Sequence, residues 1–321
     1  MYERKPKQVL LSPLPMREGV SASRTWLPKC DSYKNMTENY GSWDTILAFL
    51  IERFPFMPEE LFLERMARGD IVNQDGTPFR KDSPYQEETY LFYYREVPDE
   101  PAIPFYEEIL HKDEHIIVVD KPHFIPVTPT GRHVKEALLT RLKHHYQSEE
   151  ISPIHRLDRE TAGVMLFCCN KQSRSAYQNL FQNREVTKTY EAIAPISSHT
   201  FPLTHRSRMV KSSDTFFIME EVNGEPNSET YIQIIETANG LAKYRLNPVS
   251  GKQHQLRVHL MSFGSPILND SFYPELLPED RCDDYSQPLQ LLAQTIEFTD
   301  PLSNQPRRFE TKRSLNLKAT D

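Results

Sequence analysis

A charged segment that runs directly into an apolar one constrains this chain more than any other feature. Residues 155–163 read His-Arg-Leu-Asp-Arg-Glu-Thr-Ala-Gly, and residues 164–167 are all apolar. The apolar run predicts a buried strand that holds the charged loop rigidly at its entrance. Arg156 and Arg159 lie on either side of Asp158, and positive charge favours the ionised form that a carboxylate nucleophile requires. Taken alone, these residues fit either a surface loop of ion pairs or an active-site loop.

Strand patterns dominate the chain from residue 109 onward. Apolar or β-forming runs predict strands at residues 115–120, 164–169, 188–194, 215–221, 229–236, 242–246 and 295–298. A helical pattern occupies residues 135–145. Strands outnumber helices and do not alternate with them regularly, so we expect an α+β fold with a mixed, largely antiparallel central sheet flanked by helices.

Composition narrows the class of protein. Hydrophobic residues make up 38% and charged residues 26% of the 321 residues, which is typical of a globular chain long enough for two domains. The sequence has no apolar run near the roughly 20 residues of a membrane span and no secretory segment, so we expect a cytoplasmic protein without a membrane partner. A net charge of −7 argues against coating of nucleic acid by bulk electrostatics but permits local basic patches.

Candidate ligands for metals and cofactors are scarce. The four cysteines show no CxxC spacing and are expected to be reduced thiols. His111 and His115 are four residues apart, but a metal site would need a carboxylate or cysteine in register on an ordered element, and His115 begins a strand. His155 and His259 are better explained as buried hydrogen-bonding groups. Because no glycine-rich phosphate loop appears either, we expect no metal and no cofactor.

The charged segment resembles a known catalytic motif. The string His-Arg-Leu-Asp-x-x-Thr-Ala-Gly at residues 155–163, followed by an apolar strand, closely resembles the signature of RluA-type RNA pseudouridine synthases. The resemblance extends over residues 105–310. It implies the pseudouridine synthase fold, an RNA substrate, a reaction without cofactor, and Asp158 as the catalytic carboxylate.

Three further stretches occur in the family's order, and the first, residues 113–122, resembles a segment in which a strand ends in Asn-Lys-Pro, with Asp120 here in place of Asn. Residues 188–192 resemble a strand whose tyrosine sits against the target base, which implies that role for Tyr190. Residues 248–260 resemble the Thr-Gly-Arg-Thr-His-Gln-Ile-Arg-x-His motif, which makes Arg257 the expected partner of Asp158. An arginine can bind a carboxylate through two parallel hydrogen bonds and hold it charged and aimed, a geometry that lysine cannot reproduce.

Substrate-binding residues are implied by the same resemblance. Leu291 matches a position where an aliphatic side chain packs beneath the uracil, and Arg156 can hold a phosphate or enter the stack that a flipped base vacates. Lys188, Lys252 and His254 belong to the matched motifs and are expected to contact RNA. The departures from the family pattern, which bear on the choice of RNA more than on catalysis, are Asp120 for Asn, Lys252 for Arg, Gln253 for Thr, Asn269 for Gly and Leu292 for His.

The chain is expected to have three parts, which are an irregular N-terminal arm at residues 1–40, a small domain at 41–97 and, after a proline-rich linker, the catalytic domain at 105–321. In the small domain, a helix capped by Ser42, a second helix that stops at Gly69 and a following hairpin resemble an S-four-like RNA-binding α/β domain. The segment lacks the strongly basic helix usual for such a domain. A purely structural domain is therefore the alternative.

The hypothesis that unites these features is a monomeric RNA pseudouridine synthase acting on structured rRNA or tRNA. Two alternatives remain open. An RNA-binding or assembly factor could keep the fold without turnover, although the intact set of Asp158, Tyr190 and Arg257 argues against it. A glycosidase with Asp158 as nucleophile would need a second carboxylate, for which Glu160 or Asp270 could be nominated.

Overall fold

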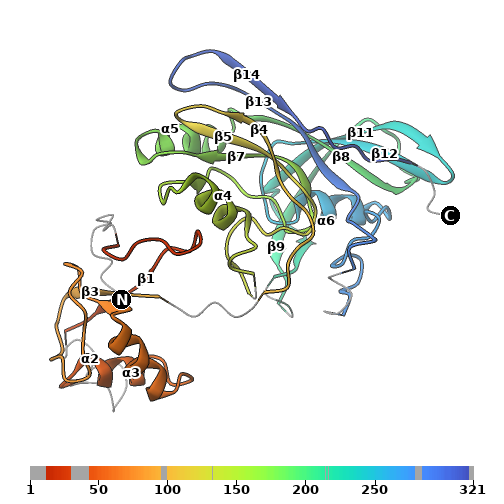
Figure 1. Ribbon diagram of the computed structural model, residues 1–321. Coiled ribbons are helices and arrows are strands. Elements are labelled where there is room, and N and C mark those ends of the chain that lie inside the picture. Colours follow the sequence, from red (N-terminus) through yellow and green to blue (C-terminus); the bar gives the residue numbers. More distant parts are fainter. Residues whose placement is uncertain are drawn as a thin grey trace. The chain divides into compact units, whose positions relative to one another are not determined.

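The chain forms two compact units, residues 1–99 and residues 100–321. The computed structural model describes residues 12–29, 43–94, 100–131, 133–213, 215, 217–278 and 284–317. Figure 1 draws the small first unit in red to orange and the second unit in yellow to blue. The boundary between the units falls inside residues 97–104, the segment expected to link them. No helix among the described residues is long and apolar enough to cross a membrane.

The first unit combines a small antiparallel sheet with two helices. Its strands, in the order β1-β3-β2, are β1 (Ser23–Leu27), β3 (Thr89–Tyr93) and β2 (Ile71–Val72), and its helices are α2 (Ile46–Arg53) and α3 (Glu59–Arg68). The apolar faces of both helices share one core with the sheet. As predicted, α3 ends at Gly69, which adopts a left-handed φ of 78° that glycine reaches without a Cβ penalty.

Part of the arm expected to be irregular is a strand. All five residues of β1 pair with β3, from Ser23↔Tyr93 to Leu27↔Thr89, and Leu27 is fully buried. The strand escaped prediction because it is short, lies among prolines and forms only through pairing with a distant segment. The predicted N-cap Ser42 lies outside the described residues, and the Thr45 side chain caps α2 by accepting from the Ala48 amide at 3.1 Å.

The second unit is built around a large sheet. Within its described residues, the sheet has eleven strands, nine of them in the order β10-β9-β11-β12-β8-β13-β7-β5-β4, while β14 pairs with β13 and β6 with β7. Every pairing is antiparallel except the parallel contact of β7 with β13. The helices of this unit are α4 (Leu138–Tyr146), α5 (Lys171–Gln182) and α6 (Gln255–Ser262). This confirms the predicted α+β fold with a mixed, largely antiparallel sheet.

The strands of the sheet have the following bounds: β4 (Glu108–Lys112), β5 (Ile116–Lys121), β6 (Ser152–Pro153), β7 (Ala162–Cys168), β8 (Thr187–Pro195), β9 (Leu203–Lys211), β10 (Met219–Val222), β11 (Ser228–Ala238), β12 (Leu241–Pro248), β13 (Leu291–Thr299) and β14 (Pro306–Glu310). The pattern did not predict β4, β6, β9, β14, α5 or α6. β9 and β14 are rich in charged side chains, and α6 is buried almost all round, from Gln255 to Leu260. Neither pattern shows the apolar stripe on which prediction depends.

The two apolar strands β5 and β7 are buried because helices cover both of their faces. Ile117 and Val119 share a core with Leu138 of α4, whereas Ile116 and Val118 pack with Tyr177 of α5. Successive side chains of a strand point to opposite faces, so α4 and α5 lie on opposite sides of the sheet here. This explains the continuous apolar runs, which are typical of strands covered on both sides.

A glycine sets the close approach of β7 and β13. Gly163 lies opposite Ala293 in the parallel pairing and has a φ of +113°, and a Cβ there would lie 2.2 Å from the Ala293 carbonyl oxygen. Only glycine fits this position. The approach brings the start of β13 beside the loop that leads into β7, where the charged segment of the sequence lies.

Candidate active site

One cavity of about 520 Å³ collects the residues singled out by sequence. Its lining comes from the loop before β7, from the end of α5, from β8, from the loop before α6, and from the start of β13. All eight predicted site residues line it, namely Arg156, Asp158, Lys188, Tyr190, Lys252, His254, Arg257 and Leu291. Of the lining residues that the structure describes, Asp158 is the only one with a carboxylate.

Asp158 stands at the cavity wall with a partly exposed carboxylate. Its side chain is 21% exposed, and the Oδ2 atom lies 3.5 Å from Nη1 of Arg257. The same oxygen lies 3.9 Å from Nε2 of His254. The Asp158 carbonyl also accepts a hydrogen bond from the Thr161 amide at 3.2 Å. The loop is therefore turned locally, while the carboxylate stays reachable from the cavity.

Arg257 makes its bidentate pair with Asp270 instead of Asp158. Its Nε donates to Asp270 Oδ2 at 2.8 Å, and its Nη2 donates to the other oxygen of that carboxylate. Nη2 also donates to Glu160 at 3.0 Å. The guanidinium is 1% exposed, and burial of such a charge is costly unless it is paired. Asp158 thus receives the weakest of the three contacts, which differs from the pairing expected from sequence.

The two carboxylates that pair with Arg257, those of Asp270 and Glu160, accept further hydrogen bonds. Asp270 accepts the backbone amides of Phe272 at 2.8 Å and Tyr273 at 3.1 Å, and Glu160 accepts the Ser271 hydroxyl. Although burial opposes it, the hydrogen bond and charge of Asp270 raise the pKa of Arg257 well above its ordinary value. Glu160 and Asp270 therefore keep the Arg257 guanidinium in place.

A buried lysine is hydrogen-bonded to the backbone of the loop that carries Asp158. Lys121 is fully buried, and its Nζ donates to the carbonyls of Pro122 at 2.9 Å, Ile125 at 2.8 Å and Arg159 at 2.9 Å. Burial lowers the pKa of Lys121 to about 7, while the charge of Asp158 acts in the opposite direction. The bond to Arg159, the residue after Asp158, ties the loop that carries Asp158 to the end of β5. Sequence reasoning noted this segment but assigned no role to the lysine.

His254 presents a neutral imidazole to Asp158. Burial lowers the pKa of His254 to about 4, so the ring is uncharged at neutral pH. Its Nδ1 lies 2.9 Å from the Tyr273 hydroxyl, which accepts the Met219 amide at 2.9 Å. Because that hydroxyl already has a donor, its own proton is available for Nδ1, and Nε2 then carries the imidazole proton that faces Asp158. Tyr273 was not predicted, and no local motif marks it.

Tyr190 and Leu291 are among the apolar side chains that line the cavity. Tyr190 on β8 stands opposite Ala293, and Leu291 opposite Ala192 in the same pairing of β8 with β13. Burial, helped by the charge of Asp158, raises the pKa of the Tyr190 hydroxyl above its ordinary value, so the phenol is protonated at neutral pH. A neutral ring beside the 3% exposed Leu291 offers a flat apolar surface to a base.

Cations surround the mouth of the cavity. Arg156, Arg184 and Lys252 are exposed lining residues, and Lys188 is half-buried. Burial, followed by the charge of Arg184, lowers the pKa of Lys188. Arg184 follows α5 and was not predicted, because it lies outside the matched motifs. Such a group of cations is suited to the phosphates of a nucleic acid backbone.

Comparisons with known proteins find a matching family and several relatives. The family described as RNA pseudouridylate synthase matches residues 115–262. An uncharacterised RNA pseudouridine synthase of Mycoplasma genitalium is 30% identical over 225 residues, which cover 67% of this chain and 72% of the relative. The dual-specificity RNA pseudouridine synthase RluA of Salmonella typhi is 31% identical over 64% of this chain and 90% of the relative.

A solved structure extends the comparison to the fold. Human RNA pseudouridylate synthase domain containing 4 is 25% identical and superposes with a TM-score of 0.50, over 64% of this chain and 87% of the human chain. The sequence motifs, the sheet and the relatives lead to one conclusion. The chain belongs to the RluA family of RNA pseudouridine synthases, which are isomerases.

Proposed function

We propose that this protein converts specific uridines of structured rRNA or tRNA to pseudouridine, with Asp158 as the catalytic carboxylate. The observation that carries the proposal is the position of Asp158, the sole carboxylate among the described lining residues of a cavity that also holds Tyr190 and Leu291. The relative from Salmonella typhi is named a dual-specificity enzyme. That name favours more than one RNA target.

The reaction breaks the bond between N1 of uracil and C1′ of the ribose, turns the base and joins C1′ to C5. The proton on C5 leaves and N1 gains a proton, so no electron donor, acceptor or energy source is needed. Asp158 acts on the sugar or the base, and the neutral Tyr190 and Leu291 keep the detached uracil in place. A water accepts the C5 proton, because the Tyr190 hydroxyl, with its raised pKa, stays protonated at neutral pH.

Entry of the base requires flipping. A uridine inside folded RNA has to leave its stack, at a cost of a few kcal/mol. Arg156 is exposed and stands two residues before Asp158, so its guanidinium can fill the vacated stack or hold a phosphate. Lys188, Lys252 and His254, which line the same cavity, bind the nucleotide and its neighbours.

The decisive experiment compares the wild-type protein with Asp158→Asn. Total RNA from a deletion strain is incubated with each protein, and pseudouridines are mapped at single-nucleotide resolution. The wild-type protein should restore sites present in the parent strain, whereas Asp158→Asn should restore none and still bind RNA. Full activity of Asp158→Asn would end the proposal.

Two other functions predict different experimental results. An assembly factor without turnover would leave the pseudouridine map of a deletion strain unchanged while ribosome assembly is impaired. A glycosidase would release free uracil and would need a second carboxylate on the reacting sugar, whereas Glu160 and Asp270 are engaged by Arg257. Assaying free uracil beside pseudouridine separates these chemistries.

The proposal also covers the oligomeric state and the cellular location of the enzyme. We expect a monomer in the cytoplasm. Cys168 and Cys169 are free thiols, which is consistent with a reducing compartment. Light scattering of the purified protein tests the oligomeric state.

The small first unit, expected to be S-four-like, is proposed to add RNA affinity. Exposed cations on it include Arg80 and Lys81. Lys81→Glu should weaken RNA binding without changing the reaction rate at saturation.

A further inference from the structure

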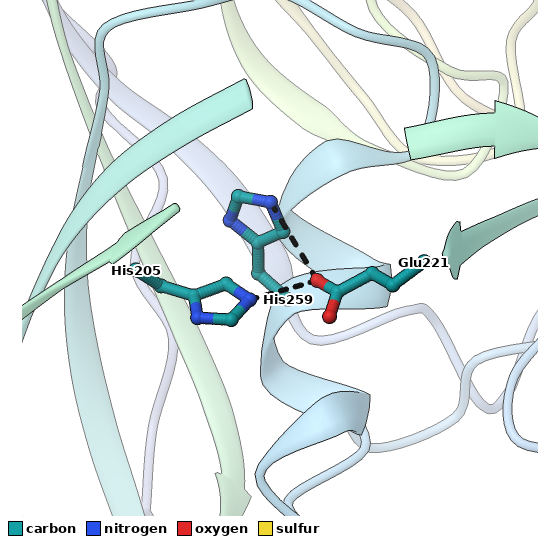
Figure 2. A group of neighbouring side chains, drawn as sticks. All are labelled: His205, Glu221 and His259. Atoms are coloured by element: carbon teal, nitrogen blue, oxygen red, sulfur yellow. Dashed lines mark hydrogen bonds and ion pairs between the residues drawn. The ribbon is translucent and has the colours of Figure 1, made fainter. Parts of the chain in front are cut away.

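Three potential metal ligands converge outside the cavity described above. They are His205 on β9, Glu221 on β10 and His259 on α6, and their nearest ligand atoms all lie within 4.8 Å of one another. Figure 2 shows both imidazoles directed at the same carboxylate oxygen. His205 Nε2 lies 2.8 Å from Glu221 Oε1, and His259 Nε2 lies 3.8 Å from it.

The fold brings these side chains together on one face of the sheet. β9 and β10 are adjacent, with Glu221 opposite Met209, and His205 points to the same side as Met209 because side chains alternate along a strand. Met209 and Met219 pack with Val258 of α6. The helix therefore covers this face and delivers His259 to the two strand residues.

We propose that His205, Glu221 and His259 form a binding site for a divalent transition-metal ion of the Zn²⁺ type, with water as the fourth ligand. Two imidazoles and one carboxylate are a common ligand set for such ions. With metal–ligand bonds of about 2.0–2.1 Å and tetrahedral angles, neighbouring ligand atoms stand about 3.3 Å apart. The distances of 2.8 Å and 3.8 Å to Glu221 lie on either side of that value, and all three ligand atoms lie within 4.8 Å of one another, so side-chain shifts of about 1 Å bring them to a common ion.

Charge and exposure suit the same assignment. Burial lowers the pKa of His259 to about 4, which leaves a lone pair on its neutral ring at pH 7. Although burial opposes it, the hydrogen bond to His205 holds the pKa of Glu221 below its usual value. The His259 side chain is 0% exposed, whereas those of His205 and Glu221 are 19% and 23% exposed. The fourth position therefore faces solvent.

The surroundings also set an upper limit on affinity. A ligating imidazole usually donates its second N–H to a carboxylate or carbonyl, and loss of such support costs about 10- to 100-fold in metal affinity. His259 Nδ1 has no hydrogen-bond partner within the described part of the chain. We therefore expect dissociation constants in the micromolar range. Without metal, Nε2 of His259 has the hydroxyls of Ser228 at 3.1 Å and Ser207 at 3.3 Å as partners.

The site goes beyond the proposed function and departs from the metal-free expectation drawn from sequence. None of its three residues lines the cavity, so the ion does not enter the isomerisation. Its effect is to fasten α6, the helix that carries Arg257, to the β9–β10 hairpin. Thermal stability is therefore the property that should respond.

The test uses the full chain, freed of metal with a chelator and then titrated with Zn²⁺ against a chromophoric competitor. One site per chain is expected in the wild-type protein, with affinity lowered at least about tenfold in both His205→Ala and Glu221→Gln. His144→Ala is the matched control, because His144 is an exposed histidine on α4, and it should bind like the wild-type protein. Excess Zn²⁺ should raise the Tm by several degrees in the wild-type protein and the control only.

Each result of the zinc titration either supports or overturns the proposed site. A wild-type protein without a stoichiometric site, or a site that survives in both His205→Ala and Glu221→Gln, overturns the assignment and leaves a hydrogen-bonded cluster. Circular dichroism of the metal-free variants shows that they are folded, and if one variant does not fold, the other decides. The readout is metal binding, so the result is independent of pseudouridine formation.

Discussion

Arg257 and Asp270 form the bidentate ion pair of the active site, with Nε 2.8 Å from Oδ2 and both groups buried. Asp158 is left with a single contact of 3.5 Å to the same guanidinium. The pair holds the cation in place while the Asp158 carboxylate stays open to the cavity. Because Asp270 and not Asp158 holds the guanidinium, a change at Asp270 should displace it.

Asp270→Asn should lower both stability and rate. It removes the partner that compensates a buried guanidinium, and breaking a buried ion pair costs about 3–5 kcal/mol. The misplaced cation should also slow pseudouridine formation. Urea unfolding and single-turnover rates measure the two effects. Glu297→Gln, at an exposed ion pair with Arg308, is the control and should change little; an Asp270→Asn protein as stable as this control would contradict the prediction.

Tyr273→Phe should slow the reaction more than it weakens RNA binding. The change removes only the hydroxyl that joins the Met219 amide to His254 Nδ1. The amide loses a buried partner, at a cost of about 1–3 kcal/mol, and the imidazole can change tautomer and turn its Nε2 proton away from Asp158. The rate at saturating RNA and the dissociation constant are measured separately. Equal proportional losses in both would argue for a merely structural hydroxyl.

Stability should fall as the pH is lowered from about 6.5 to about 4. Burial lowers the pKa of His123 and His254 to about 4 from an ordinary value of 6.5. In that window the unfolded chain binds protons that the folded chain does not, so the stabilisation is complete above pH 6.5 and is lost as the pH falls toward 4. Each histidine contributes at most about 1.4 kcal/mol per pH unit.

The variant His123→Asn tests this pH dependence. His123 Nδ1 lies 2.6 Å from the Glu160 carbonyl oxygen, and the asparagine amide can donate to that oxygen without titrating. Urea unfolding at several pH values should give a shallower slope for the variant than for the wild-type protein. Identical slopes would show that His123 does not contribute.

Lys252→Gln should weaken RNA binding and reduce its dependence on salt. Lys252 is exposed at the cavity mouth, and loss of one phosphate contact lowers the slope of log affinity against log salt by about 0.7–1. Binding of a structured RNA is measured across a salt series. Arg308→Gln, a change at a cation that pairs with Glu297 and Glu310, should leave the slope as it is. A slope unchanged in Lys252→Gln would remove this residue from the RNA contacts.

The contiguous motifs predicted much of the site. Asp158 and Arg156 belong to one short string, Tyr190 to a single strand, and Arg257 with His254 to another string, and all of them line one cavity. Local sequence also predicted β5, β7 and α3 with its end at Gly69, because an apolar run or a left-handed glycine is a property of neighbouring residues.

Other features depend on pairings between segments far apart in the chain. The pairing of β1 with β3, the charged edge strand β14 and the buried helix α6 carry no local apolar stripe. The partner of Arg257 could not be read from sequence, since three carboxylates compete for one guanidinium and only their positions in space decide.

The sequence alone was enough to identify the family motifs and their candidate residues, namely the loop with Asp158, the strand with Tyr190 and the motif with Arg257. Tertiary structure alone decided that Asp270 takes the arginine fork, that Tyr273 orients His254, and that His205, Glu221 and His259 meet. The reason is the distance along the chain over which each kind of interaction acts. Backbone periodicity acts over a few neighbouring residues, whereas the energy of a buried charge or imidazole depends on groups that only the folded chain brings within hydrogen-bonding distance.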